Sequence, residues 1–193
     1  MDLLELSDDL VPASPLEIID RQGVNVTQRK IYIDDIDEET GTWFLKVRDY
    51  LADLGGSPIE VVLNTPGGDV NSMFVFHDAV QSSPVPIHTL GTGMVCSAGV
   101  LMLACGHVSR VTESCVWMSH EPSGFGGDGL RLSEARDRRR ADDWTQEHWA
   151  NLMSRHTPRD SAYWKSISKR KAEYWICGGE AIVQAGMADE VKR

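Results

Sequence analysis

Short β-branched runs alternate with helical stripes along most of this 193-residue chain, and that alternation restricts the fold more than any other feature. The clearest pair is an apolar stripe at helical spacing over 43–54, stopped by Gly55 and Gly56, followed by the run IEVVL at 59–63. Strands that alternate with helices favour right-handed βαβ units and a mostly parallel sheet, whose functional sites form in the loops after the strands. Further strands are expected at 30–33, 87–90, 108–111 and 116–118, and helices at 69–81, 97–104, 132–156, 160–171 and 179–184.

Composition narrows the possible partners. The chain carries a net charge of −10, which argues against nucleic acid and against an anionic membrane surface as partners. No apolar run approaches the length of a membrane span, and the acidic first residues lack the basic start and apolar stretch of a signal peptide, so we expect a cytoplasmic protein. We interpret residues 1–28 as a flexible acidic arm and residues 29–193 as one domain.

The four cysteines lie at positions 96, 105, 115 and 177, without a Cys-x-x-Cys pair and without a neighbouring His at ligand spacing. This usage is typical of buried free thiols in a reducing compartment. We therefore expect neither disulfides nor a metal site.

The segment GMVCSAG at 93–99 presents one serine, Ser97, on a turn of small residues directly before a run with helical period. A serine hydroxyl becomes a useful nucleophile only with a base within reach and donors for the developing oxyanion. The segment thus indicates a catalytic serine. A helix N-cap is the alternative interpretation, because Ser is a favoured N-cap residue.

The turn NTPGG at 64–68 also joins a strand to a helix, so it is expected to face the same crevice as Ser97. Two adjacent glycines let backbone N–H groups approach a ligand closely, as an oxyanion hole requires, although most such pairs are ordinary turns. His120 is a candidate base because it directly follows the strand 116–118. The other candidate histidines are His77, His88, His107, His148 and His156.

Taken together, these segments resemble the ClpP-type serine peptidases, the proteolytic subunits of ATP-dependent Clp proteases. The segment at 64–68 is similar to the family's Asn-Ser-Pro-Gly-Gly turn, and the segment at 93–99 to its Gly-x-Ala-Ala-Ser-Met-Gly loop. MSHEP at 118–122 is similar to the family's Met-Ile-His-Gln-Pro strand. EA at 180–181 and GMAD at 186–189 resemble the Glu-Ala and Gly-Leu-Ile-Asp motifs near the end of the family's sequences. The four motifs occur in order, at near-family spacing.

The resemblance implies a role for each matching residue. Ser97 would be the nucleophile and His120 the general base, and the N–H groups of Gly68 and Ala98 would form the oxyanion hole. The family's third member is an Asp, and the matching position holds Glu173. Its extra methylene moves the carboxylate, so Asp160 remains an alternative third member, as does a group other than a carboxylate.

The implied fold is the repeated ββα superhelix of the ClpP and crotonase families, with a mostly parallel sheet and a protruding handle. The Gly-rich stretch and long helix at about 123–156 take the place of the handle, where Gly124, Phe125 and Gly126 would pair with substrate backbone. The arginine-rich segment 131–140 reads as a solvated helix face, with an oligomer contact as the alternative. The family usually has an Arg at the position of Ala172 that helps couple ring contacts to the active site, and an alanine cannot provide this coupling.

The implied activity is that of a serine endopeptidase that cleaves peptides or unfolded proteins inside a homo-oligomeric assembly. That assembly would be a heptameric ring or a stack of two such rings. No cofactor or metal is implied, and ATP enters only through a separate AAA+ unfoldase. Two alternatives share the fold: a non-catalytic ring subunit and a crotonase-type acyl-CoA enzyme. A Ser–Lys peptidase is a further alternative, with the base drawn from Lys165, Lys169 or Lys171.

Overall fold

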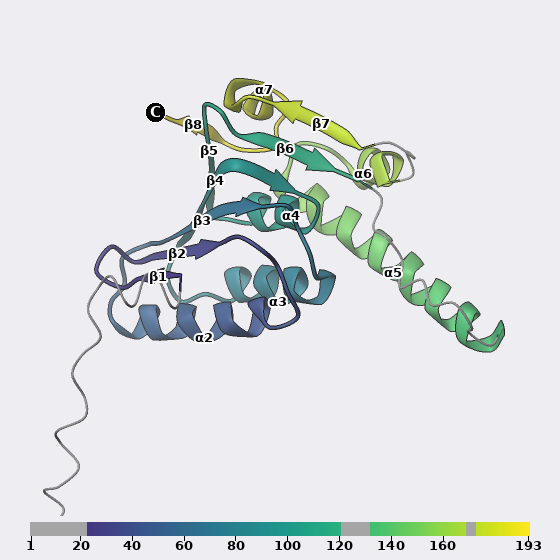
Figure 1. Ribbon diagram of the computed structural model, residues 1–193, viewed down its shortest axis with the longest axis horizontal. Coiled ribbons are helices and arrows are strands. Elements are labelled where there is room, and N and C mark those ends of the chain that lie inside the picture. Colours follow the sequence, from purple (N-terminus) through teal and green to yellow (C-terminus); the bar gives the residue numbers. More distant parts are fainter. Residues whose placement is uncertain (1–22, 121–131, 169–172) are drawn as a thin grey trace, which may run out of the picture.

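The computed structural model describes residues 23–120, 132–168 and 173–193, and Figure 1 shows their arrangement. The strands are β1 (Val24–Asn25), β2 (Lys30–Ile33), β3 (Ile59–Thr65), β4 (Ile87–Cys96), β5 (Val108–Thr112), β6 (Val116–Ser119), β7 (Tyr174–Cys177) and β8 (Glu190–Lys192). The helices are α2 (Thr40–Asp53), α3 (Val70–Gln81), α4 (Ala98–Ala104), α5 (Leu132–His156), α6 (Ser161–Ser168) and α7 (Gly179–Gln184).

The strands form a sheet in the order β1-β2-β3-β4-β5-β8, and β6 branches from β4 to pair with β7. All pairings are parallel except β1 with β2 and β6 with β7, so the predicted mostly parallel α/β sheet is confirmed. Strand β4 makes the branch possible by its length. Its residues 88–91 pair with β5, and its residues 94–96 pair with β6. The sequence pattern ended this strand at 90, six residues too early.

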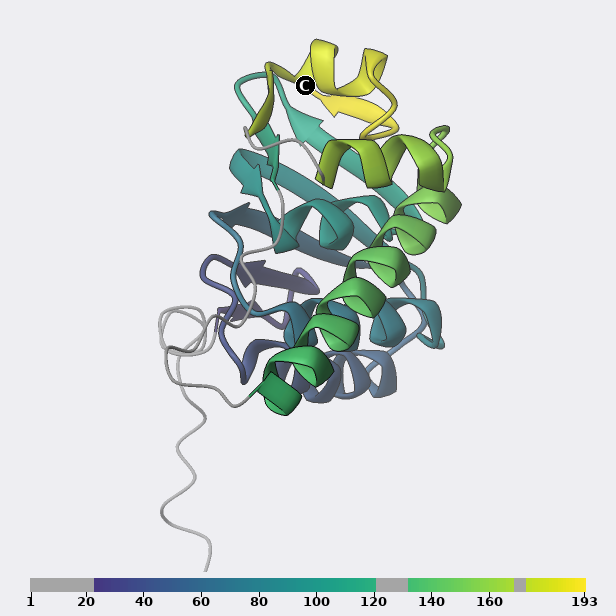
Figure 2. The same cartoon turned by 90° about the vertical axis from the view of Figure 1, so that its right-hand side faces the viewer.

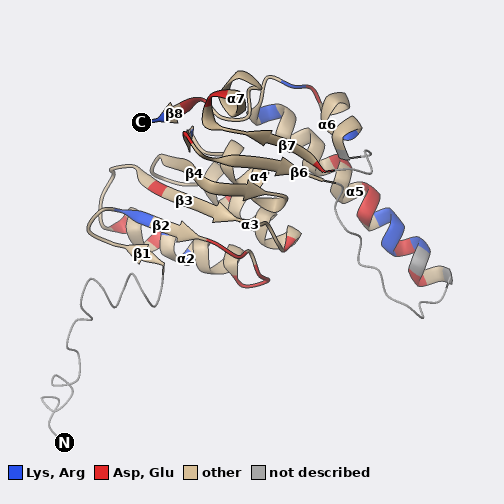
Figure 3. Ribbon diagram, turned by 45° about the horizontal axis from the view of Figure 1, so that its top comes forward, with Lys and Arg blue, Asp and Glu red and all other residues tan. Residues whose placement is uncertain are grey.

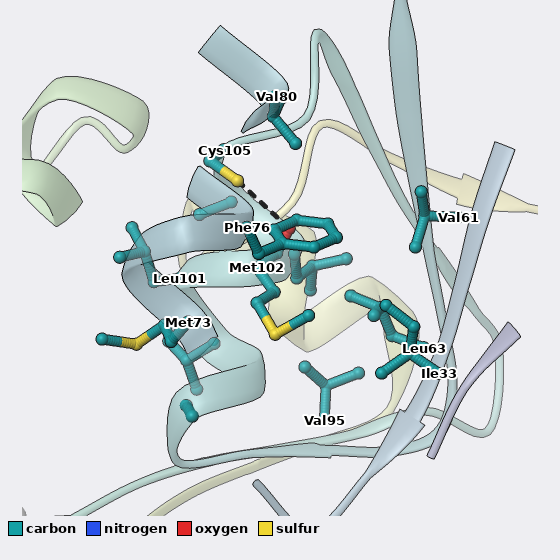
Figure 4. Packing of buried hydrophobic residues seen from close by; sticks show 14 of the residues in the cluster. Ile33, Val61, Leu63, Met73, Phe76, Val80, Val95, Leu101, Met102 and Cys105 are labelled. Carbon is teal, nitrogen blue, oxygen red and sulfur yellow. Dashed lines mark hydrogen bonds between the residues drawn. The ribbon is translucent and has the colours of Figure 1, made fainter. Parts of the chain in front are cut away.

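The main core lies between the sheet and helices α2, α3 and α4. Strand β3 alternates buried and less buried residues, as expected for a strand with one face packed on helices. Phe44 of α2 and Phe76 of α3 meet with ring centroids 4.2 Å apart. Figure 4 shows Phe76 packed among aliphatic side chains from β2, β3, β4 and α4. This core fixes the ends of β3 and β4, from which the predicted site loops extend.

A second aromatic cluster anchors helix α5. Trp164 of α6 lies between Trp149 of α5 and Trp117 of β6, with ring centroids 5.5 and 6.2 Å away. Only the C-terminal half of α5 is buried, whereas its described arginines at 136 and 138–140 are exposed. Figures 1 and 2 show α5 as a long helix that runs diagonally past the sheet and beyond it, and Figure 3 shows its charges. The exposure of those arginines fits both the predicted solvated helix face and its alternative, an oligomer contact.

Two expectations need correction. The last part of the predicted arm belongs to the sheet, because β1 pairs with β2 through Val24 and Ile31; residues 1–22 lie outside the described part. All four cysteines are free, but Cys177 is exposed, because it stands at the end of an edge strand. Burial raises the pKa of the Cys115 thiol to about 11. Among the residues that the structure describes, no helix is long and apolar enough to cross a bilayer.

Candidate active site

Ser97 occupies a strained turn between β4 and α4. Its φ of 54° and ψ of −118° are rare for a residue with a side chain and cost about 1–3 kcal/mol. The turn is held by the Ser97 N–H, which donates to Met118 O at 2.8 Å, and by Val100 N–H, which donates to Ser97 O at 3.1 Å. Ser97 stands at the N-cap position, but its side chain makes no capping hydrogen bond. A cap therefore does not account for this serine.

Helix α4 provides a rigid base for this turn. All seven of its residues are buried, which is typical of a helix surrounded by other elements. A Cβ added at Gly99 would lie 2.5 Å from Thr65 Cγ2, so the first turn of α4 packs directly on the end of β3. The backbone that carries Ser97 therefore has little freedom to move relative to β3.

The Pro66-Gly67-Gly68 turn lies against the Ser97 turn, as the sequence predicted. Gly67 has a φ of 105°, and a Cβ built there would stand 2.5 Å from Ser97 Cβ and 2.9 Å from Cys96 O. No other residue fits this position without displacing Ser97. Asn64 links the two loops further, because its side-chain oxygen accepts a hydrogen bond of 3.1 Å from Met94 N–H.

The N–H groups of Gly68 and Ala98 suit the predicted oxyanion hole. Ile36 forms a parallel bridge with Gly68: Ile36 N–H donates to Gly67 O, and Asp69 N–H donates to Ile36 O. In such a bridge the N–H of the central residue points away from the partner, so Gly68 N–H points away from Ile36. Ala98 is the first residue of α4, so its N–H lacks a partner inside the helix.

His120 directly follows β6, where the sheet places it beside the Ser97 turn. Cys96 pairs with Met118 in the parallel β4–β6 ladder, so Ser97 follows the end of β4 beside the last residues of β6, and His120 is the first residue after β6. His120 is partly buried. The predicted nucleophile and the predicted base thus lie at the ends of two paired strands, β4 and β6.

Glu173 directly precedes β7 and lies across the ladder from His120. The antiparallel β6–β7 register pairs Met118 with Trp175 and Ser119 with Tyr174, and the next residues beyond that pair are His120 and Glu173. The carboxylate is close enough to Cys96 that, after burial, it is a cause of the raised pKa of the Cys96 thiol. Strand β7 was missing from the sequence expectations, and it is the element that positions Glu173.

The alternative third member, Asp160, has a structural task. Its carboxylate accepts a hydrogen bond of 2.7 Å from Tyr163 N–H at the start of α6. This is the pattern of a helix N-cap. Among the alternative bases, Lys165 is paired with Glu147 at 2.8 Å. Ala172, Lys169 and Lys171 lie outside the described residues.

The other candidate histidines have contacts that tie them to the framework. His77 bonds to Asp78 through Nδ1 at 2.9 Å and to His156 through Nε2 at 3.1 Å, which joins α3 to α5. His148 stacks on Trp144, with ring centroids 4.6 Å apart. His88 and His107 lie near the start of β4 and directly before β5, at the opposite end of these strands from Ser97. His120 is therefore the described histidine that best fits a base for Ser97.

Parts of the predicted site cannot be placed. Gly124, Phe125 and Gly126, expected to bind substrate backbone, lie outside the described residues. The residues that the structure describes contain no group of three or more His, Cys, Asp or Glu side chains that could hold a metal ion. The predicted independence from cofactors is untested.

Comparisons with known proteins identify the family of this chain. Residues 23–193 match the model of the Clp protease family. The chain is 31% identical over 138 residues to the ATP-dependent Clp protease proteolytic subunit 2 of Gluconobacter oxydans, covering 68% of this chain and 59% of that protein. It is 29% identical over 147 residues to subunit 1 of Salinibacter ruber, covering 74% and 60%. The chain thus spans about three fifths of the length of these relatives.

A solved structure gives the same fold. A ClpP1 variant from Listeria monocytogenes superposes with a TM-score of 0.77 at 19% identity, over 87% of this chain and 93% of that one. The fold and the family match define a peptidase-type α/β protein of the ClpP class. The chain belongs to the Clp protease family.

Proposed function

We propose that this chain is a serine endopeptidase subunit that hydrolyses peptide bonds through an acyl-enzyme on Ser97. The observation that carries the proposal is the strained backbone of Ser97, pressed against the Gly67–Gly68 turn. Ser97 is partly buried, and a serine at a sharp strand-to-helix turn is the arrangement that other hydrolases use to present a nucleophile. Neither an N-cap nor a simple turn needs a serine at this φ and ψ.

Acylation would begin when His120 takes the proton of the Ser97 hydroxyl and the oxygen attacks the substrate carbonyl carbon. The negative charge that develops on the carbonyl oxygen would be stabilised by the N–H groups of Gly68 and Ala98. Glu173 would orient the imidazole and stabilise its positive charge. His120 would then give the proton to the leaving amine, and the peptide bond would break.

Deacylation would repeat these steps with water in place of the serine. His120 would take a proton from water, the resulting hydroxide would attack the acyl carbon, and the proton would return to Ser97 as the ester bond breaks. No metal or bound cofactor is needed for any step. ATP would be used only by a separate AAA+ unfoldase that delivers unfolded chains.

We further propose that the active form is a heptameric ring of identical subunits, either single or stacked as two rings, and that it acts in the cytoplasm. The exposed N-terminal half of α5 supports this, because a long helix that projects beyond its own domain (Figure 1) offers surface to a neighbouring subunit. Peptides or unfolded proteins are the proposed substrates, bound by backbone pairing at Gly124, Phe125 and Gly126. Nucleic acid and membranes are not proposed as partners.

Hydrolysis of a fluorogenic peptide, measured with native mass on the same samples, tests the proposal. The wild type should cleave the peptide, and Ser97→Ala and His120→Ala should not, with the oligomer mass unchanged in all three. Ser166→Ala is the control, because Ser166 lies on α6, outside the candidate site, and its hydroxyl donates a hydrogen bond to Tyr163 O of the same helix. An assembled ring in which the wild type is as inactive as Ser97→Ala would favour the non-catalytic subunit, which Glu173 in place of Asp also motivates.

A further inference from the structure

Trp175 bonds to the carboxylate that the proposed mechanism needs. Its indole Nε1–H donates a hydrogen bond of 3.0 Å to Glu173 Oε2. Trp175 lies in β7, and Glu173, which directly precedes the strand, is two positions away, so the two side chains stand on the same side of the chain. Trp175 is 47% exposed, so packing alone does not account for a tryptophan on this edge strand.

The same face carries the rest of the proposed catalytic edge. Trp175 is registered with Met118 of β6, and Met118 with Cys96 of β4, so these three side chains share a face. His120 and Glu173 lie two residues from Met118 and Trp175 respectively, and they share that face as well. The influence of Glu173 on the pKa of Cys96 agrees with this placement.

A glutamate at this position has a need that an aspartate lacks. Its side chain has one more rotatable bond, and Glu173 is exposed, so an unrestrained carboxylate would sample several rotamers. A carboxylate that orients a histidine must keep one geometry, because a misplacement of about 1 Å lowers the rate on the order of 100-fold. A donor fixed on the same strand restricts this freedom by holding one carboxylate oxygen.

We infer that Trp175 is a positioning residue: its indole N–H holds Oε2 of Glu173, so that the carboxylate stays on the face of His120. This inference rests on the proposed peptidase function. Trp175 acts through Glu173 and touches neither the nucleophile nor the proposed oxyanion donors. The chain thereby combines a longer acidic side chain with a neighbour that restrains it.

The test compares second-order rate constants for labelling of Ser97 by a fluorophosphonate at pH 8, using the full chain in its assembled form. Trp175→Phe removes the donor but keeps an aromatic ring, and it should slow labelling about tenfold. Trp175→His retains a ring N–H at the corresponding position and should restore most of the rate. Tyr50→Phe is the control, because Tyr50 is 55% exposed on α2, and it should label like the wild type.

The same comparison in the Glu173→Ala background separates positioning from general support of the fold. If Trp175 acts through Glu173, Trp175→Phe should cause no further loss there. An equal loss in both backgrounds, or wild-type labelling by Trp175→Phe, would overturn the inference while leaving the peptidase proposal intact. A faster rate in Trp175→Phe would also overturn it, because the indole would then hold the carboxylate away from His120. A wild type that is neither labelled nor hydrolytic would overturn both proposals.

Discussion

The two halves of the candidate site are held in different ways. The nucleophile half, residues 64–68 and 93–99, is fixed by buried packing and by glycines that exclude any side chain. The base-and-acid half consists of His120 and Glu173, which lie at one end of the antiparallel pair β6–β7. The side chain of Glu173 is exposed. We infer that the core fixes the position of the nucleophile, whereas the residue type at the position of the acid can change without disturbing the core. The replacement of the family's Asp by Glu173 falls in that second half.

The largest effect should follow from removing the base. His120→Ala should lower peptide hydrolysis about 10,000-fold, because the serine then has no proton acceptor in the attack. The melting temperature should stay within about 2 °C of the wild type, because His120 follows the last residue of β6 and is only partly buried. Steady-state kinetics and differential scanning calorimetry check the two parts. Residual activity within about tenfold of the wild type would exclude His120 as the base.

The next effect should come from the turn that touches the nucleophile. Gly67→Ala places a methyl group against Ser97 Cβ and Cys96 O at a φ of 105°, so labelling should fall about 100-fold and the melting temperature about 5 °C. Gly56→Ala is the matched control, because nothing lies within 4 Å of its Cβ position. The two halves would not differ as described if Gly67→Ala and Gly56→Ala behaved alike.

Removing the acid should affect rate without affecting stability. Glu173→Ala should slow hydrolysis about 100-fold. The loss should appear mainly in kcat, because the orientation of the imidazole affects the reaction step and leaves substrate binding unchanged. Because Glu173 is exposed, the free energy of unfolding should change by less than about 0.5 kcal/mol. Kinetics at several substrate concentrations, with urea denaturation, measure both. A loss of stability as large as that of Gly67→Ala would contradict the contrast between the halves.

The smallest effect should come from the contact of α3 with α5, outside both halves. Asp78 can only accept, so His77 donates through Nδ1, and His77 Nε2 shares a hydrogen bond of 3.1 Å with His156 Nε2. Burial, followed by His77 and Arg155, lowers the pKa of His156. The unfolded state therefore binds more protons, and stability should be full above about pH 6.5 and fall as the pH drops below it.

His156→Gln should accordingly reduce the drop in melting temperature between pH 7.5 and pH 5.5 by about 2 °C. Thermal scans across that range measure the effect, and labelling of Ser97 at pH 8 should be unchanged. A slower labelling rate in this variant would show that the α3–α5 contact is coupled to the active site.

The two loops of the nucleophile half could be located from the sequence, whereas the strand pairing beside His120 and Glu173 could not. Gly68 lies in a short turn and Ser97 directly precedes α4, so their residue types indicate the two loops, and a parallel sheet brings such loops to one edge. Glu173 is positioned by pairing between β6 and β7, a register that only the folded chain defines. The four residues YWIC of β7 form an apolar run too short to distinguish a strand from the end of a helix. The bond of Trp175 to Glu173 was missed for the same reason.

The most direct test is to treat the wild type and Ser97→Ala with a fluorophosphonate, measure intact masses and map the modified peptide. The account predicts one adduct per wild-type chain, located on Ser97, and none on the variant. No adduct on a folded and assembled wild type, or an adduct that persists in Ser97→Ala, would contradict the claim that the turn between β4 and α4 holds an activated nucleophile.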